Sequence, residues 1–168
     1  MQPSEALGTA AQIAVALAGF AGVVVAFRSG SMEEWHTIDK FRLRLLLSNS
    51  VVPLVLCMIA ILLDAVIPQP PWIWRACSGV ALVLTILFGS IITRGLGLSA
   101  PRELNLTGAS KLLFICFGAG GVAAMLLQIY NVTTLNAFWP FYTSVVFQLI
   151  TAAIQFVRLL LIRPQPSV

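Results

Sequence analysis

Five long apolar segments, separated by short polar connections, limit the fold of this chain more than any other feature of its sequence. A helix needs roughly 20 apolar residues to cross the hydrocarbon core of a bilayer. The chain is 59% hydrophobic and only 10% charged, which is typical of a membrane protein and not of a soluble domain. We therefore expect an all-α integral membrane protein, with residues 1–168 forming one membrane domain, a bundle of five transmembrane helices. The expected spans are residues 7–27, 43–66, 73–93, 111–131 and 137–161.

The basic residues are distributed unevenly between the two sides of the expected bundle. Arg75 lies alone on one side, and the other side holds Arg28, Lys40, Arg42, Arg44, Arg94, Arg102, Lys111, Arg158 and Arg163. Because cytoplasmic connections carry the excess of Lys and Arg, this asymmetry predicts an N-terminus outside and a cytoplasmic C-terminus. The net charge of +4 then reflects topology and anionic lipid head groups, so no nucleic-acid partner is expected. The overall pattern favours a bacterial cytoplasmic membrane.

The fifth span carries a polar stripe. Its members follow one another at steps of 4, 3, 4 and 3 residues, which places them on one face of a helix: Ser144, Gln148, Thr151, Gln155 and Arg158. Lipid cannot satisfy these groups, so this face must meet protein or water. Three interpretations remain open: a dry seam against the second span, the lining of an aqueous path within or between subunits, or a docking face for another membrane protein.

The second span contains Ser48, Asn49 and Ser50, followed by Pro53. Proline removes a backbone hydrogen bond and clashes with the carbonyl four residues earlier. The pattern predicts a kink that neighbouring polar side chains repair locally. Asn49 is at the same time a candidate for the lining of a polar path, and the two interpretations are compatible.

Asp64 and Arg75 lie at the facing ends of the second and third spans. A short proline-rich turn joins these spans, so we expect the two side chains to form an ion pair near the outer surface. Such a pair would neutralise two charges that are costly in a membrane. The alternative is a charged ring at the mouth of a pore.

Small residues recur at helical spacing in the first and fourth spans. They are Ala14, Ala18, Gly22, Gly118 and Gly121. Small side chains let helix backbones approach closely, which is how membrane helices associate. They predict either packing within the chain or a surface for self-association or for another membrane protein.

Residues 32–44 form an amphipathic stretch before the second span. Ser31 and Glu34 have the spacing of a capping box, so we expect a helix that lies at the inner interface and runs into the second span. His36 is the only histidine, and Glu33 precedes it by three residues. A metal site would need further carboxylates from other helices, so we expect a solvated polar face, with pH sensing by His36 left open.

No motif for catalysis appears in the sequence. The single histidine leaves no Ser/His/acid set, and the three cysteines, Cys57, Cys77 and Cys116, form no close pair. We therefore expect no enzyme activity, no cofactor and no metal ligand, and the cysteines are expected to pack as small apolar residues. The tripeptide that begins at Asn131 matches a glycosylation acceptor, which is a short and weak pattern.

The leading expectation for function is a small homo-oligomeric channel or pore. The fifth span would line the polar path, with Asn49 as a contributor. The alternative is a non-catalytic accessory or assembly subunit of a larger membrane complex, which would bind its partner through the small-residue faces.

Overall fold

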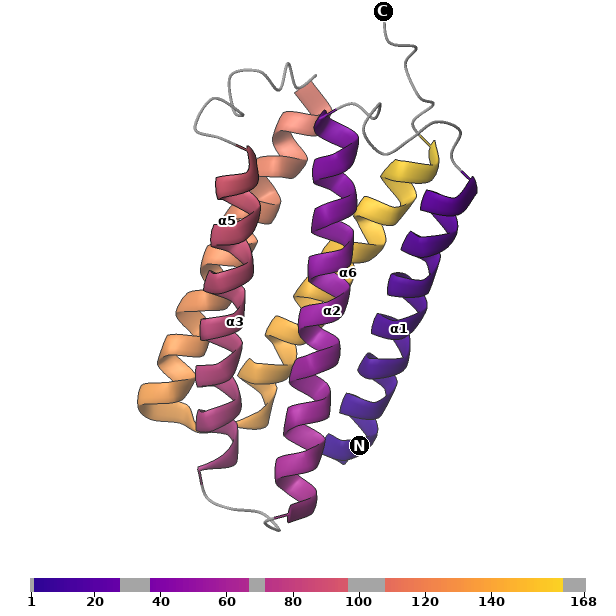
Figure 1. Cartoon of the computed structure of the whole chain (residues 1–168). Coiled ribbons are helices and arrows are strands. Elements are labelled where there is room, and N and C mark those ends of the chain that lie inside the picture. The colour runs from indigo at the N-terminus through magenta and orange to yellow at the C-terminus, as the bar shows by residue number, and fades with distance from the viewer. Residues whose placement is uncertain (1, 28–36, 67–71, 97–107, 162–168) are drawn as a thin grey trace, which may run out of the picture.

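A computed structural model describes residues 2–27, 37–66, 72–96 and 108–161 of the chain. All the secondary structure in these residues is helical, and five long helices run up and down one bundle (Figure 1). They are α1 (Pro3–Phe27), α2 (Thr37–Val66), α3 (Ile73–Leu96), α5 (Gly108–Tyr130) and α6 (Phe138–Leu161), and a short π-helical turn, η2 (Asn131–Leu135), joins α5 to α6. Each of the five is long and apolar enough to cross a membrane. The predicted all-α bundle of five spans is confirmed, with most helix ends within a few residues of those expected.

Each helix satisfies its backbone hydrogen bonds within its own segment, as a membrane interior requires. The most demanding place is Pro53, inside α2, because proline lacks an N–H. The helix nevertheless continues through it without a break. One turn before the proline, the Asn49 amide donates a hydrogen bond to the Leu45 carbonyl and the Ser50 hydroxyl to that of Leu46, both at 2.8 Å. Local side chains therefore bond to the α2 backbone near the proline.

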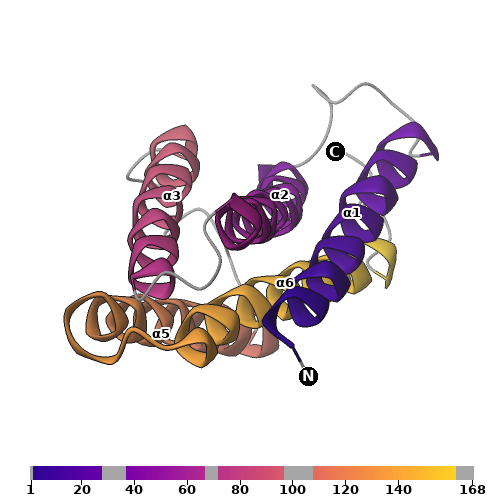
Figure 2. The same ribbon diagram turned by 90° about the horizontal axis from the view of Figure 1, so that it is seen from below.

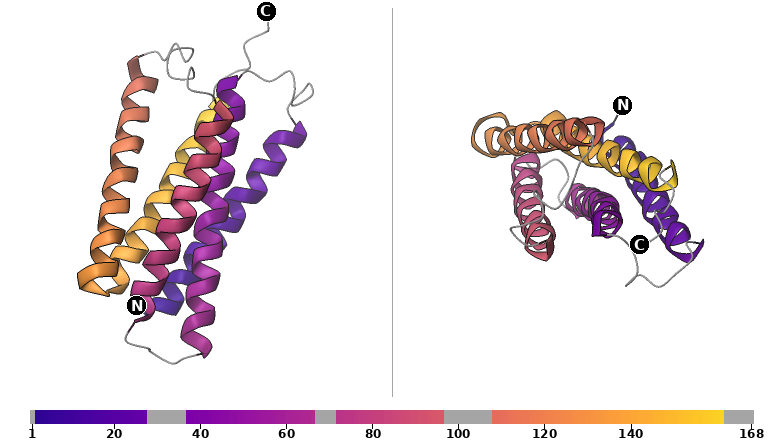
Figure 3. Two further views of the ribbon diagram at one scale, coloured as in Figure 1. Left: turned by 60° about the vertical axis from the view of Figure 1, so that its left-hand side comes forward. Right: turned by 90° about the horizontal axis from the view of Figure 1, so that it is seen from above.

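Seen along the bundle, four helices form a U around the fifth (Figure 2). The order around the U is α3, α5, α6 and α1, and α2 lies inside it, packed on α1, α6 and α3. Figure 3 shows α5 standing apart from the other helices at the end where it begins. The apolar core therefore gathers around α2, with Leu7, Leu46, Leu56 and Phe141 among its fully buried side chains.

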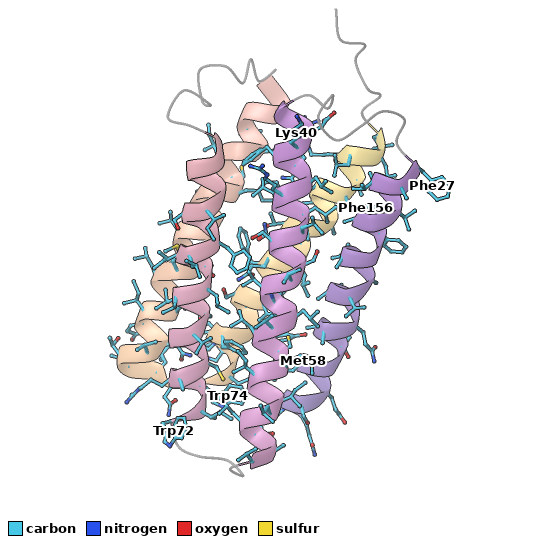
Figure 4. All side chains as sticks on the ribbon, in the orientation of Figure 1. Phe27, Lys40, Met58, Trp72, Trp74 and Phe156 are labelled. Atoms are coloured by element: carbon cyan, nitrogen blue, oxygen red, sulfur yellow. The ribbon has the colours of Figure 1, made fainter. Side chains whose placement is uncertain are left out.

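The bundle has two chemically different ends. Trp72 and Trp74 lie at one end, together with η2, and we call it the aromatic end (Figure 4). Lys40 and Phe27 lie at the other, where α6 also finishes, and we call it the basic end because Lys40, Arg42 and Arg158 belong to it. The chain begins α1 at the aromatic end and completes α6 at the basic end (Figure 1).

The amphipathic stretch is described only from Thr37, and there it is the beginning of α2 and not a separate surface helix. Its polar face is also less solvated than predicted. Asp39 and Arg42 are 8% and 6% exposed, and the Arg42 guanidinium donates to the Asp39 carboxylate at 3.2 Å. The expectation of a solvated face is therefore wrong for these two residues. His36 and the capping box of Ser31 and Glu34 lie outside the described residues.

Candidate functional site

The polar stripe of α6 lies inside the chain. Ser144, Gln148, Thr151 and Gln155 are all buried, with Gln155 only 3% exposed, and Arg158 is partly buried at the basic end. All five line one cavity of about 380 Å³, together with Asn49 of α2. The structure thus brings together all six residues of the predicted stripe and path around one cavity within a single chain.

The cavity lies between α2 and α6 on one side and α3 and α5 on the other. Its polar lining comes mainly from α2 and α6. The opposite wall is mostly apolar, and its larger side chains include Leu82, Phe88, Phe117, Val122 and Met125. The site is therefore a two-faced slot, with hydrogen-bonding groups on one wall and hydrocarbon on the other.

Two buried amide oxygens on this lining have no hydrogen-bond donor. They are Oε1 of Gln155 and Oε1 of Gln128. The other end of the Gln128 amide is fixed, because its Nε2 donates to the Pro140 carbonyl at 2.7 Å. A buried acceptor without a donor costs about 1–3 kcal/mol, so nearly all such groups in proteins find a partner. These two atoms are therefore available as acceptors for water or for another hydrogen-bond donor that enters the cavity.

At the basic end the lining is positively charged. Arg42 and Arg158 both border the cavity and come from different helices, α2 and α6. Asp39 is paired with Arg42 but does not line the cavity itself. Among the described lining residues there is no carboxylate, and the two guanidinium groups are the charged groups of this lining.

At the aromatic end four aromatic rings from α3 and α6 pack against one another. Trp74 of α3 meets Phe138 edge-on at a centroid distance of 4.8 Å, and Phe138 stacks on Tyr142 at 5.2 Å. Phe141 is fully buried, 6.2 Å from Trp74. None of these four rings is a lining residue. The cavity therefore ends before the aromatic end.

Asn131 organises the backbone beside these rings, a role that no sequence pattern indicates. It is fully buried, and its Nδ2 donates to the Ser78 hydroxyl at 2.7 Å and to the Ala137 carbonyl at 3.1 Å. Its Oδ1 accepts from the Ala137 N–H at 2.9 Å. Asn136, in the left-handed conformation with a φ of 47°, accepts the Arg75 N–H of the first turn of α3 at 3.0 Å. An asparagine so enclosed is not accessible for glycosylation in this fold.

The remaining predicted residues are placed as follows. Asp64 and Arg75 form no ion pair in the described part of the chain, where Asp64 is partly buried and Arg75 exposed. Ala14 is fully buried within the chain and Gly22 is exposed. Gly118 and Gly121 line the cavity. Cys57 and Cys77 are buried and Cys116 is exposed, and all three are free thiols.

No protein family, curated protein or solved structure matches this chain. The polar groups of the cavity are amides, hydroxyls and guanidinium groups, which bind through hydrogen bonds and charge. Within the described residues, no three His, Cys, Asp or Glu side chains come close enough to hold a metal ion. What the site offers chemically is the recognition of a polar or anionic group next to an apolar surface.

Proposed function

We propose that this protein is a channel or transport protein that takes a small solute into a polar path within one chain, with α6 as the principal lining helix. The observation that carries this proposal is the burial of the α6 stripe against a cavity of about 380 Å³ that contains two amide oxygens without donors. A volume of this size is in the range of ligand-binding pockets.

The length of the stripe supports a path more than a local packing contact. From Ser144 to Arg158 it extends about 21 Å along α6, at a rise of about 1.5 Å per residue. The hydrocarbon core is about 30 Å thick, so the polar groups cover most of it. In our proposal these polar groups form the hydrogen bonds that water would otherwise make to a solute entering from the basic end. Passage to the other side then requires the aromatic rings to separate.

The position of the stripe also changes the expected form of an oligomer. A pore between subunits needs its polar lining on the outside of each chain, whereas this lining faces inward. In our proposal each subunit of a homo-oligomer holds its own path. A single chain in a nanodisc would then bind or pass the solute as well as an oligomer does.

For orientation we propose that the basic end is cytoplasmic and the N-terminus outside, in a bacterial cytoplasmic membrane. The support is the distribution of Lys and Arg along the sequence. Thiol labelling of Gln69→Cys from outside and of Ser99→Cys from inside tests this orientation in a cysteine-free background. The reverse labelling pattern would contradict it.

Flux through proteoliposomes tests the function itself. Gln148→Leu combined with Gln155→Leu removes two amides from the lining, and we expect solute or ion flux to fall about tenfold or more, since each tenfold needs only about 1.4 kcal/mol. The matched control is Ile150→Leu with Val157→Leu, two exposed positions on the same helix. Unchanged flux in the double leucine variant would contradict the proposal, and loss of folding would identify the stripe as a packing seam.

One observation favours the alternative, an accessory or assembly subunit. Gly19 and Gly22 of α1 are both exposed, and a Cβ added at either would meet no atom within 4 Å. This part of α1 is open to close approach by a helix of another chain. If Gly22→Leu abolishes a stable complex with a co-purified membrane protein while flux is absent in all variants, the assembly function replaces transport.

A further inference from the structure

We propose that the cavity binds a neutral amphiphile with a hydroxyl head group, which donates a hydrogen bond to Gln128 while its hydrocarbon part lies along the wall of α3 and α5. This inference rests on the proposed function, because it names the class of solute that the same cavity takes. Three features carry it: the fixed amide of Gln128, the lack of a carboxylate among the described lining residues, and the division of the walls.

The Gln128 amide is held with its oxygen as a free acceptor. Gln128 is only 2% exposed and lines the cavity, and its Nε2 donates to the Pro140 carbonyl at 2.7 Å. That carbonyl accepts and cannot donate, so turning the amide over would bring two acceptors together. Oε1 is therefore the atom left without a donor, and a ligand that donates to it removes the cost of a buried acceptor.

Ser144 lies beside this amide. In an α-helix the N–H of Ser144 points at the carbonyl four residues earlier, that of Pro140, which is the atom that Gln128 also bonds. The Ser144 side chain is 5% exposed and lines the cavity too. A hydroxyl both donates and accepts, so a ligand hydroxyl can donate to Oε1 of Gln128 and accept from the hydroxyl of Ser144.

The lining also limits the charge of the head group. A carboxylate has no hydrogen to donate to Gln128. An ammonium group could donate, but a cation inside a membrane protein needs an opposite charge, and no described lining residue is a carboxylate. A neutral hydroxyl donates without this requirement, so it fits the surroundings of Gln128 better than either ion.

The wall opposite the polar stripe fits the hydrocarbon part of the ligand. It includes Phe88 of α3 and Phe117, Val122 and Met125 of α5. Val122 is 58% exposed and lies within the candidate span of α5, so this wall continues to a surface that faces lipid in a membrane. Water would satisfy Gln128 but would leave the apolar wall wetted, whereas a hydrocarbon chain covers it.

The test is photolabelling of the purified full-length protein in phosphatidylcholine nanodiscs with a diazirine derivative of octanol. We expect mass spectrometry to find the label on lining residues of α3 or α5. Two isomers then compete with the probe: octanol, whose hydroxyl donates, and heptyl methyl ether, which only accepts. At equal mole fractions in the bilayer, octanol should compete about tenfold better, the effect of one buried hydrogen bond. Equal competition, or label confined to residues outside the cavity, would overturn the proposal.

Two glutamine variants locate the hydroxyl of the ligand. Gln128→Met keeps the length of the side chain and removes the acceptor, so octanol and the ether should compete equally in this variant. Gln12→Met removes the same amide from an exposed position of α1, and it should retain the preference for octanol. A preference that survives in Gln128→Met would overturn the proposal. The competition in the unaltered protein needs no variant, so it decides the ligand class even if Gln128→Met fails to fold.

A third variant separates failure of this inference from failure of the proposed function. Gly121 lines the cavity, and an added Cβ would meet nothing within 4 Å, so Gly121→Leu should fill part of the cavity and abolish labelling there. If it alters flux while octanol and the ether compete equally in the unaltered protein, the path survives and the ligand class is wrong. If octanol is preferred while flux is absent in every variant, the ligand class stands and transport is wrong. If neither flux nor labelling responds, both proposals fail.

Competition by dioleoylglycerol, a neutral lipid with one hydroxyl that stays in the bilayer, identifies the source of the ligand. If dioleoylglycerol displaces the probe as octanol does, the cavity takes its ligand from the bilayer lipids. If only octanol displaces the probe, the site takes a single-chain alcohol. Both results support a neutral amphiphile with a hydroxyl head group, and they differ only in where it comes from.

Discussion

The bundle has a packed side, formed by α2 and α6, and an open side, formed by α5. On the packed side, 44% of the most apolar 18-residue stretch of α6 is buried within the protein, and 39% of the corresponding stretch of α2. On the open side, the buried share of the corresponding stretch of α5 is 11%. Hydropathy does not explain the difference, because α1 is nearly as apolar as α2 yet only 22% buried. What distinguishes α2 and α6 is their polar side chains. In a membrane, an apolar helix face is equally well accommodated by lipid and by protein. The polar side chains therefore decide which face of a helix turns toward the interior of the bundle.

The largest contrast between the two sides should appear when a leucine is truncated. Leu46→Ala on α2 leaves a cavity in the core, and we expect it to lower the free energy of unfolding by about 2–5 kcal/mol. Leu126→Ala on α5 removes the same atoms from a side chain that is 61% exposed, and it should change the free energy by less than about 0.5 kcal/mol. Denaturant titration in bicelles measures both. Equal losses would show that the open side is packed as tightly as α2.

The open side should be anchored at its aromatic end by Asn131. Asn131→Ala removes the side chain that bonds Ser78 and Ala137, and the buried groups left without partners should lower the free energy of unfolding by about 2 kcal/mol. Thr133→Val is the control, because this exposed hydroxyl bonds only within its own turn. If both variants are neutral, the connections between α3 and α6 at this end contribute nothing to stability.

Two small residues of α1 should respond differently to enlargement. Ala14 is fully buried against the packed side, so Ala14→Leu should lower the free energy of unfolding by about 1–2 kcal/mol, in the lower part of the range for overpacking. Gly22 is exposed with no atom within 4 Å of an added Cβ, so Gly22→Leu should leave the stability of the monomer unchanged. Unfolding in detergent measures the first effect. The mass of the assembly in native mass spectrometry shows whether Gly22 contacts a second chain.

The smallest effect on stability is expected where α5 meets α6. A Cβ added at Gly120 would lie 2.5 Å from the ring of Phe147, which lines the cavity, so Gly120→Ala must displace that ring. The cost of an off-rotamer ring is about 0.5–1.5 kcal/mol, and the gain in helix propensity from glycine to alanine, about 1 kcal/mol, nearly offsets it. Gly118→Ala, which meets nothing, should be slightly stabilising. Altered ligand binding in Gly120→Ala alone would tie this ring to the cavity.

The spans could be predicted from the sequence because length and hydropathy alone determine whether a segment can cross a bilayer. The inward turn of the α6 stripe was predictable for a similar reason, since its spacing puts Ser144 to Arg158 on one face that lipid cannot satisfy. Whether that face meets another subunit or the same chain was not predictable. It depends on where α2 and α5 lie, and the sequence carries no signal for helix order in space.

Other parts of the site were missed because their role depends on distant partners. Gln128 is a single amide in an apolar segment of the sequence. Its role follows only from the fold, in which it donates a hydrogen bond to the Pro140 carbonyl and lines the cavity. Asn131 resembled a surface acceptor because a tripeptide pattern says nothing about burial. The amphipathic pattern near residue 40 predicts a solvated face for Arg42, because the pattern does not show that α2 lies inside a U of four helices.

Thiol accessibility tests most directly whether the stripe faces a solute-accessible cavity within one chain. In a background with Cys57, Cys77 and Cys116 replaced by alanine, Thr151→Cys and Val145→Cys place thiols on the same helix, one on the cavity and one in the packed core. Single chains in nanodiscs are then treated with a small water-soluble methanethiosulfonate reagent. Our account predicts that Thr151→Cys reacts and that Val145→Cys is protected. Protection of both thiols would contradict it, because the stripe would then be a dry seam.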